Sequence, residues 1–333
     1  MGGSVLTEEP PTCWYVSSSW GVHDQRWVEA LQDQGFRVLI RDTNDDATGP
    51  ATARQDIESS PPHWSVVAGP LETVTKTLLG IPNRLIGLSW GFDLLAHKSS
   101  DVDHSWLAEL DHLIVDSVQT ERIARGAGLA EGAISVIPWG VDLRAFTTDG
   151  TDAPSPIVLS LRAHEPVYRV ADLFEAWPNL LDRHPDAVLL IGNSGSLTED
   201  FKETIKRRGL QSSVRFLGRI PESDLPTLLR SASTYVSTSP IDGTSVTMLQ
   251  AMACGVPVVV TDTENNRSWI THRESGHLFE SGDSNDLAEQ LHRSLAAELQ
   301  DHRNMANTAR ATVVERADWT ANTKRLRDIV AGG

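Results

Sequence analysis

Cysteine, positive charge and long apolar runs are all scarce in this sequence of 333 residues. Cys13 and Cys254 are too few for a disulfide framework. The sequence has no run of about 18 apolar residues that could span a bilayer. Its first residues, MGGSVLTEEPPT, lack the basic start and apolar core of a signal peptide. These absences predict a protein of the reducing cytoplasm with no membrane partner.

Basic residues are outnumbered, with 29 Lys and Arg against 45 Asp and Glu and a formal net charge of -16. Residues 1–150 carry 10 basic and 21 acidic side chains, a formal charge of -11. Nucleic acids and anionic lipids attract clustered positive charge, so neither is predicted as a partner. A small soluble partner is favoured, and the oligomeric state stays open, a homodimer included.

Familiar cofactor and metal-binding motifs are also missing. No G-x-G-x-x-G follows a strand-like run, which removes the main reason to expect a nicotinamide enzyme. The eleven histidines and two cysteines show no metal-ligand spacing. The sequence therefore predicts chemistry without a bound cofactor or metal.

Short apolar runs do alternate with segments of helical character. Parallel sheets covered by helices on both faces produce this alternation, which predicts an α/β fold with two such sheets. The predicted strands are residues 13–19, 36–42, 64–69, 84–90, 112–117 and 134–140, then 156–162, 187–193, 214–218, 234–239 and 256–262. The predicted helices are residues 24–35, 108–111, 118–128, 170–184, 197–209, 225–233, 246–253 and 286–299.

A stretch dense in Gly, Pro, Asp, Ser and Thr, residues 146–156, predicts a linker between two domains. The first domain would cover residues 1–148 and the second residues 156–315. A further helix is expected within residues 316–333.

The segment DGTSVTMLQAMACGVPVVVTD, residues 242–262, predicts a buried helix with an open start. Val246, Leu249 and Ala253 recur at helical spacing, and Gly255 follows the helix end. Thr244 or Ser245 would be the N-cap.

A helix that is apolar on nearly all sides is buried, so the free amides of its first turn need acceptors. We expect Gly243, Thr244, Ser245 and Val246 to present backbone N–H groups to the phosphates of a ligand. The alternative is a capped core helix that binds nothing.

Two arginines strengthen the phosphate interpretation. Arg162 follows the strand-like run at 156–162, and Arg169 comes seven residues later, before a helix. Both lie where loops leave the carboxyl edge of a parallel sheet, which is where open α/β sheets bind ligands. The planar fork of arginine suits diphosphate oxygens.

Residues 157–295 resemble the donor-binding domain of the family-four retaining glycosyltransferases. Upstream, HLIVDSVQT and ISVIPWGVDLRAF resemble the last two blocks of that family before its linker. The matching blocks, whose order and spacing are specific, are LSLRAHEPVYRVADLFEAW, LLIGNSG, VRFLGRIPESDL, residues 242–262 and WITHRESGHLFESGDSNDLAEQL.

The resemblance implies the GT-B fold, in which two Rossmann-like domains face a central cleft. Residues 1–148 would bind the acceptor, and residues 156–315 would bind a nucleoside-diphosphate sugar linked to GDP or UDP. Residues 316–333 would form a helix that returns to the first domain. The resemblance also implies transfer that requires no metal.

The donor residues follow from the matching blocks. Arg162 and Arg169 would hold the diphosphate, and the loop of Gly218, Arg219 and Ile220 would border the nucleobase.

A pair of glutamates eight residues apart is usual in the family, and it falls here on Asp242 and Gln250. Asp242 keeps a carboxylate beside the sugar, and Gln250 can still bond ribose hydroxyls. The exchange leaves the identity of the sugar open.

The first domain departs further from the family. Trp90 stands where the family often has a histidine near the reacting carbon. Asp242, Arg162 and His23 are the predicted catalytic residues, with His23 orienting the acceptor or relaying a proton. The predicted acceptor-binding residues are Trp20, Gly21, His23, Asp24, Trp90, Asp93 and Trp139.

The resemblance therefore predicts a retaining glycosyltransferase acting on a small soluble acceptor, such as one in an antibiotic pathway. A thiol acceptor, as in the sulfur-glycosylating enzymes of lincosamide biosynthesis, would suit a site without the usual histidine, because a thiolate needs little help from a base. Two alternatives stay open, namely a nucleotide-sugar epimerase or hydrolase and a non-catalytic subunit that binds nucleotide sugar.

Overall fold

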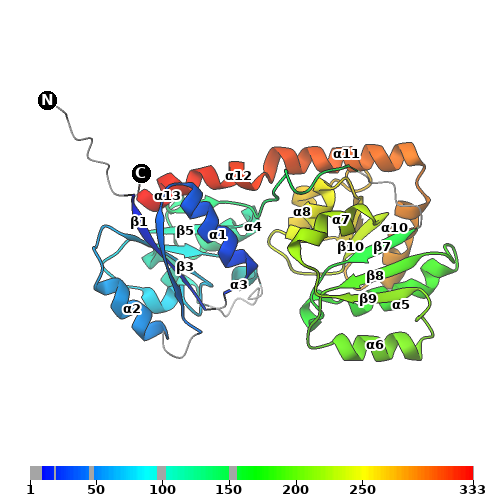
Figure 1. Cartoon of the computed structure of the whole chain (residues 1–333), viewed down its shortest axis with the longest axis horizontal. Coiled ribbons are helices and arrows are strands. Elements are labelled where there is room, and N and C mark those ends of the chain that lie inside the picture. Colours follow the sequence, from blue (N-terminus) through cyan, green and yellow to red (C-terminus); the bar gives the residue numbers. More distant parts are fainter. Residues whose placement is uncertain (1–9, 19, 45–48, 96–102, 150–155, 333) are drawn as a thin grey trace. The chain divides into compact units, whose positions relative to one another are not determined.

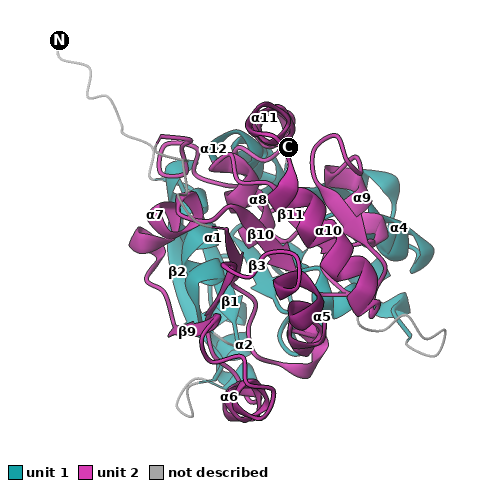
Figure 2. Cartoon of the chain, turned by 90° about the vertical axis from the view of Figure 1, so that its right-hand side faces the viewer, with its two compact units in different colours: residues 1–138, 320–333 teal, residues 139–319 magenta. Residues whose placement is uncertain are grey.

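The computed structural model describes residues 10–18, 20–44, 49–95, 103–149 and 156–332. These form two compact units, coloured separately in Figure 2. The first unit contains the chain up to Pro138 and again from Thr320, and the second runs from Trp139 to Trp319.

The division after Pro138 lies ahead of the expected linker at 146–156. Val141 and Phe146 explain its position, because both are buried in an apolar cluster of the second unit. Residues 150–155 of the expected linker lie outside the described ranges.

The first unit is built on a parallel sheet of six strands in the order β2-β1-β3-β4-β5-β6. Strands β1, β3 and β5 of this sheet are labelled in Figure 1. All six coincide with strands that the sequence predicts. The strands are β1 (Thr12–Ser17), β2 (Arg37–Asp42), β3 (Ser65–Gly69), β4 (Leu85–Leu88), β5 (His112–Val115) and β6 (Ile134–Val136).

Helices cover this sheet, and the side chains of its central strands are buried. The segment 108–111, predicted as helical, instead ends a short 3-10 helix and leads into β5. The helices of this unit are α1 (Val22–Asp33), α2 (Pro50–Glu58), α3 (Phe92–Leu95), α4 (Val118–Gly126) and α13 (Leu326–Ala331), with 3-10 turns η1 (Thr75–Leu78), η2 (Ser105–Glu109), η3 (Glu131–Ala133) and η6 (Thr323–Arg325).

The second unit has its own parallel sheet, in the order β12-β11-β10-β7-β8-β9. Its strands are β7 (Ile157–Ser160), β8 (Val188–Gly192), β9 (Val214–Gly218), β10 (Thr234–Ser237), β11 (Val258–Thr261) and β12 (His277–Phe279). Its helices are α5 (Ala171–Leu181), α6 (Thr198–Arg207), α7 (Leu225–Arg230), α8 (Val246–Ala253), α9 (Glu264–Trp269), α10 (Ser284–Ala296) and α11 (Leu299–Arg316), with turns η4 (Pro166–Tyr168) and η5 (Glu222–Asp224).

Alternating residues of β11 show that both faces of the second sheet are covered. Val258 and Val260 lie in one apolar cluster with residues of α8 and α11, whereas Val259 lies in the other with residues of α5 and α10. Successive side chains of a strand point to opposite faces, so an all-apolar run such as VVVT is what a doubly covered strand requires.

The end of the chain belongs to the first unit. Val330 in α13 is fully buried, and its carbonyl accepts a hydrogen bond of 2.6 Å from Ser65 Oγ on β3. The carbonyl of Ile329 accepts a second from Arg84. The short helix α12 (Trp319–Asn322) connects α11 to η6, and the division between the two units falls after its first residue.

Candidate functional site

The start of α8 lies directly beyond the loop that follows β10. Ser245 is its N-cap, and among the described residues its hydroxyl makes no capping hydrogen bond. Thr244 and Ser245 are 7% and 3% exposed, and every residue from Met248 to Ala253 is buried. The helix is therefore sunk in the core, with a first turn whose amides are not capped by Ser245 and carry part of the positive end of the helix dipole.

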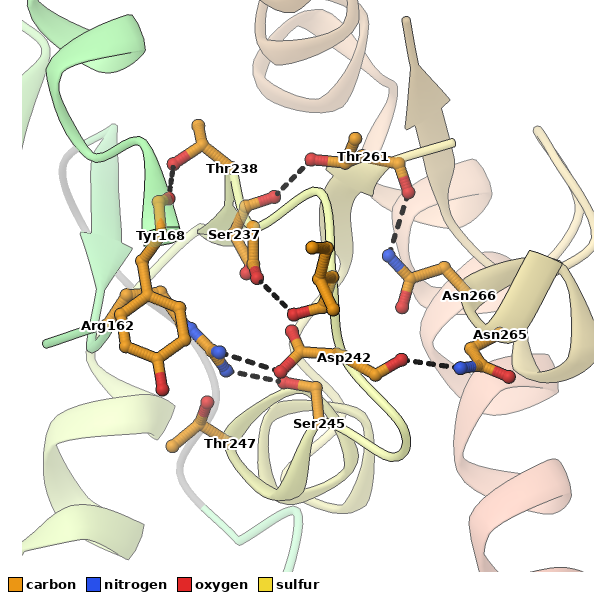
Figure 3. Close-up of polar contacts among 12 residues, drawn as sticks. Arg162, Tyr168, Ser237, Thr238, Asp242, Ser245, Thr247, Thr261, Asn265 and Asn266 are labelled. Carbon is orange, nitrogen blue, oxygen red and sulfur yellow. Dashed lines mark hydrogen bonds and ion pairs between the residues drawn. The ribbon is translucent and has the colours of Figure 1, made fainter. Parts of the chain in front are cut away.

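Arg162, after β7, crosses to this helix start (Figure 3). Its Nη1 donates to Ser245 Oγ at 3.2 Å, and its Nη2 donates to Asp242 Oδ1 at 2.7 Å. The guanidinium also stacks over the ring of Tyr168, 4.3 Å from its centroid. Burial opposes the charge of Arg162, but Asp242, with smaller contributions from Tyr235 and Tyr168, outweighs that effect and raises the pKa of Arg162. Arg162 is thus held as a fixed cation beside the α8 amides.

Two side chains here keep buried polar atoms without a partner among the described residues. Arg162 Nε is a donor that lacks an acceptor, and Gln250 Oε1 on α8 is an acceptor that lacks a donor. Leaving such atoms unpaired costs about 1–3 kcal/mol each. A ligand with anionic oxygens and hydroxyl groups would satisfy both.

A frame of hydrogen bonds positions the loop that carries Asp242. Asn265 Nδ2 donates to the Asp242 carbonyl at 2.5 Å, and Asn266 Nδ2 donates to the carbonyl of Thr261 at 2.7 Å. Thr261 Oγ1 in turn donates to the carbonyl of Ser237 (Figure 3). Sequence reasoning missed both asparagines; the signal that could have found them is an adjacent pair of polar amides just after a buried strand.

Arg169 does not share the surroundings of Arg162. It lies in the left-handed region with φ of 52°, at the end of η4, and its Nε donates to Asp172 Oδ2 at 2.9 Å. Its side chain is 43% exposed, and its guanidinium lies beside Gly282. Its role toward a diphosphate stays a prediction.

The loop after β9 contains the three residues predicted to border a base. Gly218 has φ of 70°, which favours glycine, and its carbonyl accepts a hydrogen bond of 2.6 Å from Asn193 N. Arg219 is exposed, and Ile220 packs, partly buried, against the apolar cluster that contains α8. The nucleobase role of this loop is not tested by these contacts.

In the first unit, the rings of His23 and Trp90 meet with centroids 6.2 Å apart. Trp90 Nε1 is buried and has no acceptor among the described residues. Desolvation, aided by the charge of Arg26, lowers the pKa of His23 to about 4, although part of its side chain reaches solvent. Trp20 is 41% exposed. The lowered pKa keeps the His23 imidazole neutral at pH 7.

Asp24 is engaged at the start of α1. Its Oδ2 accepts from Gly21 N at 2.8 Å and its Oδ1 accepts from Tyr15 OH at 3.0 Å. The side chain is fully buried. Burial, with the charge of Asp24, raises the pKa of Tyr15 well above its usual value. These contacts cap the helix and orient the turn that carries His23.

Asp93 braces the turn after β4. It accepts hydrogen bonds from Ser89 Oγ at 2.7 Å and from Leu71 N at 3.3 Å, and burial raises its pKa against the opposing effect of these bonds.

Trp139 is 4% exposed, stacks on Trp319 with centroids 6.0 Å apart, and belongs to the second unit rather than the first. Its place is a packing position.

Replacing Gly91 by alanine is expected to destabilise the first unit by about 1–3 kcal/mol. Gly91 has φ of 81°, and an added Cβ would lie 2.5 Å from Asp116 Oδ2. Urea unfolding would measure the loss. Gly132→Ala is the control, because a Cβ there meets nothing within 4 Å, and its effect should stay within about 0.5 kcal/mol. Equal stability of the two variants would contradict the steric argument.

Two further properties bear on the site. Within the described ranges, no cluster of three or more His, Cys, Asp and Glu side chains is suited to hold a metal ion. None of the helices in those ranges combines the length and the apolar character that a bilayer crossing requires.

Comparison with protein families finds a match between residues 146–312 and the model described as glycosyl transferases group 1. Over 199 residues the chain is 32% identical to the phosphatidyl-myo-inositol mannosyltransferase of Mycobacterium leprae, covering 57% of this chain and 51% of that protein. It is 28% identical to the N-acetyl-alpha-D-glucosaminyl L-malate synthase of Bacillus anthracis, covering 50% of this chain and 42% of that protein. The chain spans about half the length of the curated relatives it matches.

Among solved structures, HepE of Anabaena in complex with UDP and glucose matches with a TM-score of 0.80 and 17% identity, covering 97% of this chain and 100% of that one. Sucrose-phosphate synthase of Thermosynechococcus elongatus matches with a TM-score of 0.73 and 18% identity, covering 95% and 97%. This likeness confirms the predicted GT-B fold.

Proposed function

The chain belongs to the glycosyl transferases group 1, and from this premise we propose that it moves a sugar from a nucleoside-diphosphate sugar to a small soluble acceptor with retained configuration. The donor would carry GDP or UDP, and the reaction would need no metal. HepE was solved with UDP and glucose, which supports UDP as one of the two candidates.

The observation that carries the proposal is the meeting of Arg162 with the start of α8. The diphosphate would accept hydrogen bonds from the amides of Gly243 to Val246 and from Arg162 Nε, the buried donor without a partner. Donors fixed in advance stabilise the charge that develops on the departing diphosphate and need no reorganisation. Gln250 Oε1 would accept from a ribose hydroxyl.

The resemblance to retaining members of the family supplies the remaining step. The acceptor would bond to the sugar carbon on the same face from which the diphosphate departs, and a phosphate oxygen of the departing diphosphate would take the acceptor's proton, so the protein supplies no nucleophile. Asp242 would stand beside the sugar.

The acceptor would bind to the first unit near Trp20, His23 and Trp90. Aromatic faces stack planar or cationic groups, and the unpartnered Trp90 Nε1 offers a hydrogen bond. A thiol acceptor from a natural-product pathway in the cytoplasm, antibiotic formation among them, is the finer form of this proposal. The neutral His23 would serve as proton relay for an alcohol, whereas a thiolate would not need it.

The experiment is calorimetry with UDP, GDP, UDP-glucose and GDP-mannose, followed by incubation of the bound donor with soluble thiols, amines and alcohols. Mass spectrometry of the products separates the outcomes. A glycosylated acceptor supports the proposal, whereas an altered or hydrolysed donor indicates an epimerase or hydrolase. Binding without turnover indicates a non-catalytic subunit, and binding of none of the four would sink the proposal.

Trp90→Ala is expected to leave affinity for the nucleoside diphosphate unchanged and to lower kcat/KM for the acceptor by about 2- to 30-fold, since stacking on an aromatic face contributes about 0.5–2 kcal/mol. Steady-state kinetics with varied acceptor would measure the change. A matched substitution, Trp106→Ala, removes a tryptophan that is 8% exposed within the core of the same unit. It should lower stability instead. An unchanged kcat/KM in Trp90→Ala would remove the acceptor role.

A further inference from the structure

Two arginines of the second unit show how a carboxylate pairs fully with a guanidinium edge. Arg267 binds Asp262 through Nε at 2.5 Å and Nη2 at 2.7 Å. Arg169 binds Asp172 through Nε at 2.9 Å and Nη2 at 3.3 Å. In both pairs Nε and Nη2, which lie on one edge of the planar fork, each donate to a different carboxylate oxygen. This is the bidentate arrangement that arginine favours.

The pair between Arg162 and Asp242 uses only half of that edge. Nη2 donates to Asp242 Oδ1 at 2.7 Å, while Nε on the same edge is buried and has no acceptor among the described residues. The two side chains are 11% and 16% exposed, so water offers little compensation. The more buried of these arginines is therefore the one that is incompletely paired, and its Nε can still donate a hydrogen bond to another anionic oxygen.

The surroundings hold Arg162 in place more firmly than the carboxylate of Asp242. Tyr168 covers the guanidinium and Ser245 Oγ accepts from Nη1. Asn265 fixes the backbone carbonyl of Asp242, whereas the Asp242 carboxylate rests on Nη2 of Arg162 (Figure 3). A phosphate that takes both Nε and Nη2 would displace the carboxylate without moving the arginine or the loop.

We propose that Asp242 is an exchangeable counter-ion of Arg162, which a phosphate displaces and which disfavours the free nucleoside diphosphate more than the sugar-bearing donor. This inference rests on the proposed function. The terminal phosphate of a nucleoside diphosphate carries about -1.5 to -2 charges at pH 7, whereas the same phosphate esterified to a sugar carries one. A displaced carboxylate nearby repels the more highly charged product more strongly. Asp242 therefore promotes product release and limits product inhibition.

The test is calorimetry with UDP, UDP-glucose, GDP and GDP-mannose on the wild type and on Asp242→Asn. Asparagine keeps the shape of the side chain and removes its charge. Whichever diphosphate the wild type binds, UDP or GDP, we expect Asp242→Asn to bind it about tenfold more tightly. This is the size of effect expected when one like charge beside an ionised group is removed. Affinity for the matching sugar nucleotide should rise less. Inhibition of turnover by the diphosphate should strengthen in parallel.

Two controls separate this effect from a general change of charge. Glu289→Gln removes one carboxylate on α10, where it pairs with Arg183 at 2.7 Å, and should leave both affinities unchanged. In an Arg162→Ala background, both ligands should bind more weakly, but Asp242→Asn should raise the affinity for the diphosphate by at least as much, because the Asp242 carboxylate then faces the phosphate without its cation. Thermal melting confirms folding, and Asp242→Ser serves as a second variant should the first unfold.

The outcomes distinguish a failure of the proposed function from a failure of the counter-ion role of Asp242. If the wild type binds none of the four nucleotides, the proposed function fails and this inference fails with it. If the wild type binds but neither variant at Asp242 changes the ratio of diphosphate to sugar-nucleotide affinity, the counter-ion role is wrong and the proposed function stands. An equal change in Glu289→Gln would also overturn it.

Discussion

Replacing Arg162 by alanine is expected to weaken binding of a nucleoside diphosphate by about 100-fold or more, since hydrogen bonds to charged groups contribute about 1.5–3 kcal/mol each. The variant loses the unpartnered Nε and the Nη2 that Asp242 holds. It also leaves the Asp242 carboxylate, 16% exposed, facing the phosphates without its cation. Calorimetric titration with UDP and GDP measures the loss.

Arg169→Ala is the matched control, because it removes the same charge from the same unit. Its guanidinium is 43% exposed and already pairs with both oxygens of Asp172. We expect a smaller loss of affinity than in Arg162→Ala. Unaltered affinity in Arg162→Ala would remove the diphosphate role, and a loss of similar size in both variants would return Arg169 to the site.

Leu249→Ala is expected to lower the free energy of unfolding by about 3 kcal/mol, the usual cost of a cavity left by a fully buried leucine. Leu249 lies in α8, is fully buried, and packs in the cluster that joins α8 to β10, β11 and α11. Because α8 would also supply the amides for the phosphate under the proposed function, the variant should bind nucleotide more weakly as well. Chemical denaturation measures the stability.

The same substitution at the surface provides the comparison. Leu299, at the start of α11, is 61% exposed, so Leu299→Ala should change stability by less than about 0.5 kcal/mol. If the two variants unfolded at the same denaturant concentration, the central place of α8 in the core would be wrong.

The strands were predictable because the short apolar runs that mark them are local features of the sequence. Runs such as VVVT at 258–261 need an apolar cover on both faces, whatever lies elsewhere in the chain. The exception is β12, which spans only His277–Phe279 and is too short to show a pattern. The helices α2 and α11 were not predicted. The segment of α2 is polar and rich in turn residues, and α11 buries mainly small residues, Ala306 and Ala309, besides Val313, so neither shows a clear apolar stripe.

The candidate site was predictable only in part. Residue type and position at a strand end mark Arg162, and helical spacing with a small polar start marks Ser245. Neither pattern reveals that Arg162 pairs with Asp242, because 80 residues separate them. The same limit applies to Asn265, whose bond to the Asp242 carbonyl depends on how α9 lies beside the loop.

The sequence by itself determined the α/β alternation, the two parallel sheets and the buried apolar helix at 246–253, because these follow from neighbours within a few residues. Only the tertiary structure decided that Arg162 keeps a buried donor unpaired while Arg169 turns to Asp172, and that Trp139 is packed away in the second unit. The physical reason is that burial and pairing depend on which distant segments meet, and the free energy of a polar group is set by those neighbours.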